Sequence, residues 1–241
     1  MAFNFKGRSY NRITWLLDAG HGENTKGKRS PVWDDGTQLL EWSFNRTLAN
    51  KAQNIAKGDR DTFHRKPDDV TIVLLVHESE DISLSERAKR ANVYQKNHPT
   101  ELCIFLSVHG DAYTSDTAHG TTIFTSPGYT PTDNIATVFM GGMQREVESP
   151  NKRTRDAAII KTKAPSDPFS LLKPHTWRFR GAKDAKFSVL MRTTMPAMLL
   201  ETGFYTNYIE CKYMMSAKGQ GQIARAMVEG MKVVQLHLQT P

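Results

Sequence analysis

The chain has 241 residues, of which 39% are hydrophobic, 24% charged and 9% aromatic, and its formal net charge is +7. This composition is that of an ordinary globular protein, so it excludes a disordered or fibrous chain, and the length suits one domain. The balance of charge is basic, but no nucleic-acid recognition motif accompanies it, so we expect no nucleic-acid partner.

Cysteine usage and hydropathy exclude several further classes of protein. The two cysteines, Cys103 and Cys211, lie far apart and outside any CxxC pair, which excludes a disulfide framework and a thiolate zinc cluster. We expect both to be buried apolar residues. No apolar run approaches the roughly 18 residues of a membrane span, and the first dozen residues lack the apolar segment of a secretory signal. These features predict a chain made in the cytoplasm without a signal peptide and without membrane insertion.

Short apolar runs alternate with amphipathic segments, which is typical of an α/β protein. Strands are expected at residues 13–19, 70–77, 102–108, 121–126 and 197–201. Several are apolar throughout, as in strands that are covered on both faces. Helices are expected at residues 37–57, 85–95, 132–148 and 217–238, where apolar residues recur at helical spacing. Polar stretches at residues 58–69 and 150–186 are expected to be loops or insertions.

Two histidines follow expected strands directly. His21 lies between Gly20 and Gly22 after the strand at residues 13–19, and His109 follows the strand at residues 102–108. Ligands bind at the carboxyl ends of strands in open α/β sheets, so the two side chains could converge there. A single histidine in such a place is more often a hydrogen-bonded loop residue, and His77, which ends another expected strand, is an alternative ligand.

Two glutamates complete a candidate site. Glu41 lies in the first turn of the helix expected to begin near Thr37, where capping and the helix dipole alone would favour a carboxylate. Two imidazoles and one carboxylate are nevertheless a common ligand set for catalytic zinc. Glu201 ends a buried apolar strand, which is costly unless the carboxylate is bonded, paired or used. With His21 and His109, these residues predict a metal-assisted hydrolase site in which Glu201 carries protons.

Segments along most of the chain support this site, in the order LLDAGHG (16–22), Glu41, LSERAKRAN (84–92), SVHGDA (107–112) and PAMLLETGFYTN (196–207). Together they resemble the zinc-dependent N-acetylmuramoyl-L-alanine amidases of the amidase 3 family. The resemblance implies that His21, Glu41 and His109 hold one Zn²⁺ ion and that Glu201 is the catalytic carboxylate. Arg87 and Asn92 are expected to place their helix against the sheet.

The resemblance also implies a fold and a reaction. The fold would be a twisted, six-stranded, mostly parallel or mixed sheet with helices on both faces, as one catalytic domain over residues 1–241. The reaction would be hydrolysis of the amide between N-acetylmuramic acid and L-alanine in peptidoglycan. The chain departs from the family pattern at Glu23 and at Gly110–Asp111, and neither departure removes a proposed ligand.

Alternative functions share parts of this pattern. A zinc peptidase that cuts another amide would use the same ligand set, and a wall-binding module could keep the fold without turnover. A peptidoglycan amidase without a secretion signal resembles phage endolysins, which predicts action on the cell wall after holin-type release. We also expect the protein to be a monomer.

The excess positive charge lies in one segment. Residues 150–186 hold three acidic residues and ten basic ones, so this segment alone accounts for the net charge of +7. We expect a basic, proline-containing insertion that is either simply solvated or holds the protein against the anionic cell wall. The basic residues are Lys152, Arg153, Arg155, Lys161, Lys163, Lys173, Arg178, Arg180, Lys183 and Lys186.

Overall fold

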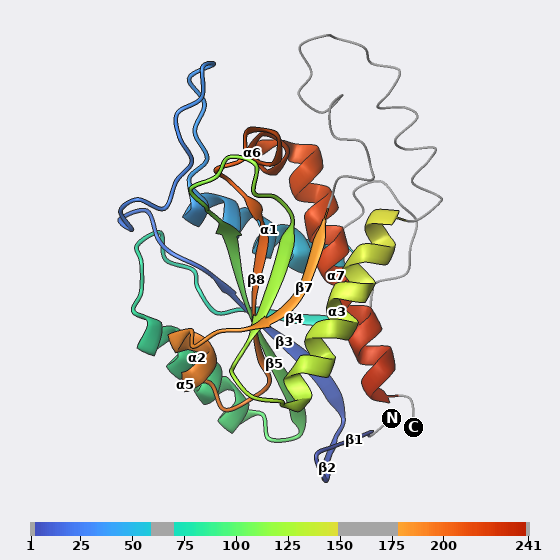
Figure 1. Cartoon of the computed structure of the whole chain (residues 1–241). Coiled ribbons are helices and arrows are strands. Elements are labelled where there is room, and N and C mark those ends of the chain that lie inside the picture. Colours follow the sequence, from blue (N-terminus) through green and yellow to red (C-terminus); the bar gives the residue numbers. More distant parts are fainter. Residues whose placement is uncertain (1–2, 59–69, 149–177, 240–241) are drawn as a thin grey trace.

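A computed structural model describes residues 3–58, 70–148 and 178–239, and its centre is a six-stranded sheet (Figure 1). The strand order is β4-β3-β5-β8-β6-β7. Strands β4, β3, β5 and β8 run parallel, β6 pairs with β8 in the antiparallel direction, and β6 pairs with β7 in parallel. The expected α/β fold with a mostly parallel, mixed sheet is therefore confirmed.

The strands and helices alternate along the chain. The sheet contains β3 (Arg12–Ala19), β4 (Thr71–Leu74), β5 (Glu101–Asp111), β6 (Thr121–Thr125), β7 (Phe179–Asp184) and β8 (Ala197–Phe204). A separate hairpin, β1 (Phe3–Phe5) and β2 (Arg8–Tyr10), precedes it. The described helices are α1 (Glu41–Ala56), α2 (Leu84–Asn97), α3 (Pro131–Glu148), α5 (Ser188–Arg192), α6 (Tyr208–Met215) and α7 (Ala217–Gln239).

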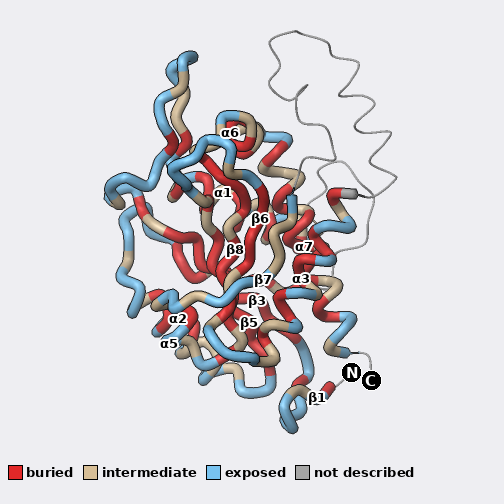
Figure 2. The backbone as a smooth tube through the Cα atoms, in the orientation of Figure 1, coloured by how far each residue is buried: buried red, intermediate tan, exposed pale blue. Residues whose placement is uncertain are grey.

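Apolar side chains project from both faces of the sheet, because successive residues of a strand point in opposite directions. On β5, Ile104 and Leu106 join the core under α1, α3 and α7, whereas Cys103 and Phe105 join the core under α2 and α5. Figure 1 shows these two groups of helices on opposite sides of the sheet, and Figure 2 shows the central strands as mostly buried. Both cysteines are buried and free, as expected.

Helix α2 is tied to the end of β3 by a buried arginine. The Arg87 guanidinium donates to the Asp18 carboxylate at 2.5 Å and to the backbone oxygens of Ala19 and His21 at 2.7 and 3.1 Å. On the same helix, Asn92 donates to the Arg192 carbonyl at 2.8 Å. Arg87 therefore places α2 against the sheet, as predicted, whereas Asn92 ties the helix to the segment that follows α5. Within the described residues, no helix is long and apolar enough to cross a membrane.

The structure differs from the sequence-based expectation in several elements. The expected loop at residues 150–186 ends in β7, a strand of the sheet, and its residues 150–177 lie outside the described residues, as do residues 59–69 of the other expected loop. Helix α1 begins at Glu41 rather than near Thr37, because residues 29–40 pair among themselves through the Arg29–Leu40 bridge. Helices α5 and α6 and the β1–β2 hairpin were not predicted.

Candidate metal centre

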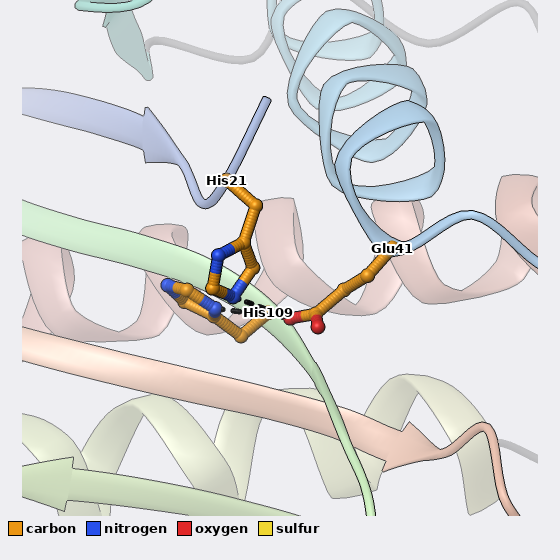
Figure 3. Close-up of side chains that lie close together, drawn as sticks. All are labelled: His21, Glu41 and His109. Carbon is orange, nitrogen blue, oxygen red and sulfur yellow. Dashed lines mark hydrogen bonds and ion pairs between the residues drawn. The ribbon is translucent and has the colours of Figure 1, made fainter. Parts of the chain in front are cut away.

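Three side chains from three elements meet at the carboxyl edge of the sheet (Figure 3). His21 follows β3, His109 lies near the end of β5, and Glu41 is the first residue of α1. Glu41 Oε1 lies 3.3 Å from His21 Nε2 and 3.1 Å from His109 Nδ1. One potential ligand atom from each residue lies within 4.8 Å of the others, and no other group of this kind occurs in the described part of the chain.

The backbone around His21 has an uncommon conformation. His21 has a φ of 63°, in the left-handed region that non-glycine residues rarely adopt. The neighbouring Gly22 is required by close packing, since a Cβ there would lie 2.0 Å from the backbone nitrogen of Asp81. Arg87 holds the turn in place through its hydrogen bond to the His21 carbonyl. The turn that follows β3 is thus fixed from two sides and aims the His21 ring at Glu41.

Gly20 provides the space for the second imidazole. A Cβ on Gly20 would lie 2.1 Å from Cε1 and 2.3 Å from Nε2 of His109, so the ring occupies the place of a missing side chain. Asn45 of α1 donates to the Gly20 carbonyl at 3.1 Å. The position of the His109 ring therefore depends on the absence of a side chain at Gly20.

A hydrogen-bonded chain sets the tautomer of His109. Ser107 Oγ donates to the Asp18 carboxylate at 2.6 Å and lies 3.1 Å from His109 Nε2. The ionised carboxylate is only an acceptor, so the single hydroxyl proton of Ser107 points to Asp18. Ser107 must then accept from His109 Nε2–H, which leaves a lone pair on Nδ1, the atom that faces Glu41. Supporting partners of this kind orient the histidine ligands of metal sites.

Glu41 is 1% exposed, and its two oxygens have different surroundings. Oε1 accepts from the backbone N–H of Gly110 at 3.2 Å, whereas Oε2 has no hydrogen-bond partner. Burial raises the pKa of the Glu41 carboxyl, but its hydrogen bonds and electrostatic interactions with His109 and His21 lower the pKa to below its usual range. One nitrogen of each imidazole ring, His21 Nε2 and His109 Nδ1, thus lies beside the Glu41 carboxylate. This donor set fits a bound cation.

Glu201 lies beside this group, at the same level of the sheet as residues of the two neighbouring strands. It is the register partner of His109 on β5 and of Thr122 on β6. Its Oε2 is buried and has no hydrogen-bond partner. Burial raises the pKa of Glu201 well above its usual value, and the carboxylates of Asp111 and Glu41 raise the pKa further. The structure thus brings all four sequence-predicted site residues to one edge of the sheet.

Comparison with known proteins gives the family. A family model described as N-acetylmuramoyl-L-alanine amidase matches residues 16–233. The chain belongs to this family. The chain is 28% identical to N-acetylmuramoyl-L-alanine amidase AmiC of Neisseria meningitidis serogroup B, over 94% of this chain and 54% of that protein. It is 26% identical to the probable cell wall amidase LytH of Staphylococcus aureus, over 91% of this chain and 57% of that protein.

A solved structure also resembles the amidase fold described above. The N-acetylmuramoyl-L-alanine amidase from Clostridium difficile 630 superposes with a TM-score of 0.66 and 24% identity, covering 91% of this chain and 95% of that one. This likeness supports the fold. The chain spans about half the length of the curated relatives it matches.

Other residues singled out in the amidase sequence lie elsewhere or gain a new role. His77 is exposed and lies beyond the end of β4, outside the group of three. The alternating pattern of β5 places Ser107 on the same face as His109, a signal that could have identified it as a supporting residue. Asp18 lies within the LLDAGHG motif, and its role depends on Ser107 and on Arg87, which comes from a distant helix.

Proposed function

We propose that this chain hydrolyses the amide bond that joins N-acetylmuramic acid to L-alanine in peptidoglycan. One observation carries the proposal: in a member of the amidase family, the ligand atoms of His21, Glu41 and His109 lie within 4.8 Å of one another, in line with the buried carboxylate of Glu201. This arrangement suits metal-assisted hydrolysis of an amide.

One Zn²⁺ ion, held by His21, Glu41 and His109, is part of the proposal. Two imidazole nitrogens and a carboxylate oxygen match the ligands of catalytic zinc sites, and Glu41 Oε2 has no other partner. A bound zinc ion would polarise the amide carbonyl and lower the pKa of a coordinated water to about 7.

Glu201 is proposed to move the proton. Its carboxylate takes a proton from the attacking water as the new C–O bond forms at the carbonyl carbon. It then returns that proton to the nitrogen of L-alanine as the C–N bond breaks. Water is consumed, and a carboxylic acid and a free amine are produced. Ser107, Gly20 and Arg87 act on the positions of the histidines rather than on the substrate.

Digestion of purified cell walls tests this assignment. Glu201→Gln keeps the shape of the side chain but cannot accept a proton, so we expect the rate to fall by about 10²- to 10⁴-fold. The matched control is Glu80→Gln, at an exposed residue, which should digest at the wild-type rate. A wild-type rate for Glu201→Gln would refute the role of Glu201.

The products separate the three candidate functions. Mass spectrometry should find free L-alanine amino termini and intact lactyl groups on muramic acid. Cuts inside the stem peptide would instead identify a zinc peptidase. Wall binding without any cleavage, even with added zinc, would identify a binding module.

The setting in which the protein acts belongs to the same proposal. We propose one catalytic domain over residues 1–241, monomeric in solution, which lyses the cell wall after holin-type release. Light scattering of the purified chain tests the monomer. Production in bacterial cells with and without a co-expressed holin tests the release, and lysis that is equally fast without the holin would exclude it.

A further inference from the structure

A cavity of about 380 Å³ lies next to the candidate metal centre. It is bounded by the end of β5, the loop that leads to β6, and the first residues of β7. Its lining includes Asp111, Thr122, Arg178, Arg180, Lys183 and Phe204. None of the proposed zinc ligands lines it, so it is a separate space at the same edge of the sheet.

The sheet register places this cavity close to Glu201. Thr122, which lines the cavity, is the register partner of Glu201, and Glu201 is in turn the partner of His109. On the far side of Thr122, β7 follows as the next strand. Neighbouring strands lie about 4.8 Å apart, so the backbone of β7 runs about 10 Å from that of Glu201. Two extended residues of a peptide span about 7 Å. A peptide of this length that starts beside Glu201 could therefore be contacted by a side chain that extends from β7.

A bulge in β7 presents Arg180 at this point. Thr121 pairs with Phe179 and Ile123 pairs with Ala182, so Arg180 and Gly181 both lie opposite Thr122. Gly181 has a φ of 80°, which favours glycine. Bulges of this type redirect side chains and are frequent next to active sites. The Arg180 guanidinium lies 5.0 Å from the centre of the Phe204 ring, a contact that holds it in the cavity wall.

The cavity has an excess of positive charge. Arg178, Arg180 and Lys183 line it, against a single lining carboxylate, Asp111. Within the described part of the chain, none of the three cations forms an ion pair with a carboxylate. Asp111 interacts electrostatically with Arg180 and Lys183, but three cations against one carboxylate leave an excess of positive charge for an anionic group of a ligand. An arginine suits a carboxylate because its donors match both oxygens.

We propose that this cavity binds a carboxylate of the stem peptide, one residue beyond the L-alanine of the scissile amide, with Arg180 as the main contact. The inference rests on the proposed function and names a further substrate contact. The carboxyl group of intact muramic acid is consumed in the scissile amide, so the carboxylates of the substrate near the cut belong to the peptide. A glutamate that follows the alanine and continues the chain through its γ-carboxyl group keeps a free α-carboxylate one residue beyond the cut. The cavity is thus a specificity subsite for an acidic second residue.

Binding of product fragments tests the subsite without catalysis. The probes are L-alanyl-D-glutamic acid with its γ-carboxyl group capped as the methylamide, the same compound with its α-carboxylate converted to the amide, and N-acetylmuramic acid, each titrated calorimetrically into the zinc-loaded full chain. We expect the acid to bind about tenfold or more tightly than the amide. Arg180→Gln should abolish this preference and Arg180→Lys should retain part of it.

A matched control is available at Arg192 on α5, which lies outside the cavity. Arg192→Gln removes the same charge and should leave the acid preference unchanged. Equal binding of acid and amide by the wild-type chain would overturn the proposal. So would an effect of Arg180→Gln on N-acetylmuramic acid alone, because it would place the muramic carboxylate in the cavity.

Turnover distinguishes failure of the subsite from failure of the proposed function. Muramyl dipeptides with a capped γ-carboxyl group and a free or an amidated α-carboxylate are compared by the ratio of their kcat/KM values. We expect the ratio to favour the acid by roughly 10-fold or more and to approach one in Arg180→Gln. If the wild type cleaves neither compound but the acid preference in binding persists, the amidase assignment fails and the subsite stands. If it cleaves both at the same rate, the subsite fails and the amidase assignment stands.

Discussion

Ser107 determines which nitrogen of His109 faces the candidate metal position. Its hydroxyl proton points to Asp18, so it accepts a hydrogen bond from His109 Nε2–H and leaves the Nδ1 lone pair toward Glu41. Ser107→Ala removes this acceptor while the ligands remain. We expect the dissociation constant for zinc to rise about 10- to 100-fold, as found for other supporting residues of metal sites.

A competition titration with a chromophoric chelator measures this affinity. The control is Ser9→Ala on the exposed side of β2, which should leave zinc affinity unchanged. Unaltered affinity in Ser107→Ala would mean that the hydrogen bond does not orient the ring.

Gly20 tests the packing of the same ring. In Gly20→Ala the new methyl group would meet the His109 imidazole at less than 3 Å, and the ring must move away from His21 and Glu41. We expect loss of zinc binding and of hydrolysis, with a folded chain by circular dichroism. Gly141→Ala on α3 is the control: a Cβ there meets nothing within 4 Å, so stability should rise by about 0.5 to 1 kcal/mol. Zinc bound at wild-type affinity by Gly20→Ala would contradict the packing argument.

At the scale of single residues, the sequence predicted the four candidate site residues and the structural role of Arg87, but not Ser107 and Gly20, which position the His109 ring. His21 and His109 could be found because each follows an apolar strand, where parallel strands bring their ends together. The contact between Arg180 and Phe204 depends on a bulge in β7. The polar sequence of this strand has no local pattern from which the bulge could be predicted.

At the scale of elements, β3 and β5 are joined at the edge opposite the candidate site by Glu101. Its carboxylate accepts from Thr14 Oγ1 at 2.6 Å and from the Arg12 guanidinium. Burial raises the pKa of Glu101, but these two hydrogen bonds lower the pKa more, so the net pKa lies below the usual value. The ionised form is favoured in the folded state. Its contribution to stability is complete above the unfolded pKa of about 4.3 and is lost as the pH falls through the folded pKa.

Glu101→Gln removes this pH-dependent contribution. We expect the variant to be less stable than the wild type by about 1.5 kcal/mol at pH 7, and the difference to shrink at pH 3. Urea unfolding at both pH values measures it. Glu80→Gln, at an exposed position, should change stability little at either pH. A destabilisation of Glu101→Gln that is constant with pH would show that its charge does not matter.

The elements that the sequence predicted are those with a clear hydrophobic pattern. Strands β3, β5 and β8 have continuous apolar runs, and α7 has a clear amphipathic period, so their positions followed directly. Strand β7 has the sequence FRGAKD, is partly to fully exposed, and pairs on only one side, at the edge of the sheet. Its composition is that of a loop. The start of α1 was missed because pairing in the preceding loop, rather than a cap at Thr37, determines it.

At the scale of the whole molecule, we propose two separable uses for the positive charge. Residues 150–186 carry the full net charge of +7, and the other residues are balanced. Within the segment, Arg178, Arg180 and Lys183 line the cavity beside Glu201. The remaining basic residues before Arg178 lie outside the described residues. Attraction to a polyanionic wall should weaken strongly with added salt and should be detected only with whole cell walls. Contact with one carboxylate should be detected with a small soluble substrate as well.

Neutralising Lys152, Arg153 and Arg155 to glutamine tests the attraction to the wall. Binding to purified cell walls should weaken at low ionic strength, because three charges are lost, and the difference from wild type should vanish near 1 M salt, where the screening length is about 3 Å. Cleavage of a small soluble muropeptide should be unchanged, in contrast to the effect of Arg180→Gln. Sedimentation of the protein with cell walls across a salt series measures the binding, and release of product from the muropeptide measures the cleavage. Loss of both activities together would show that these residues serve the fold and not the wall.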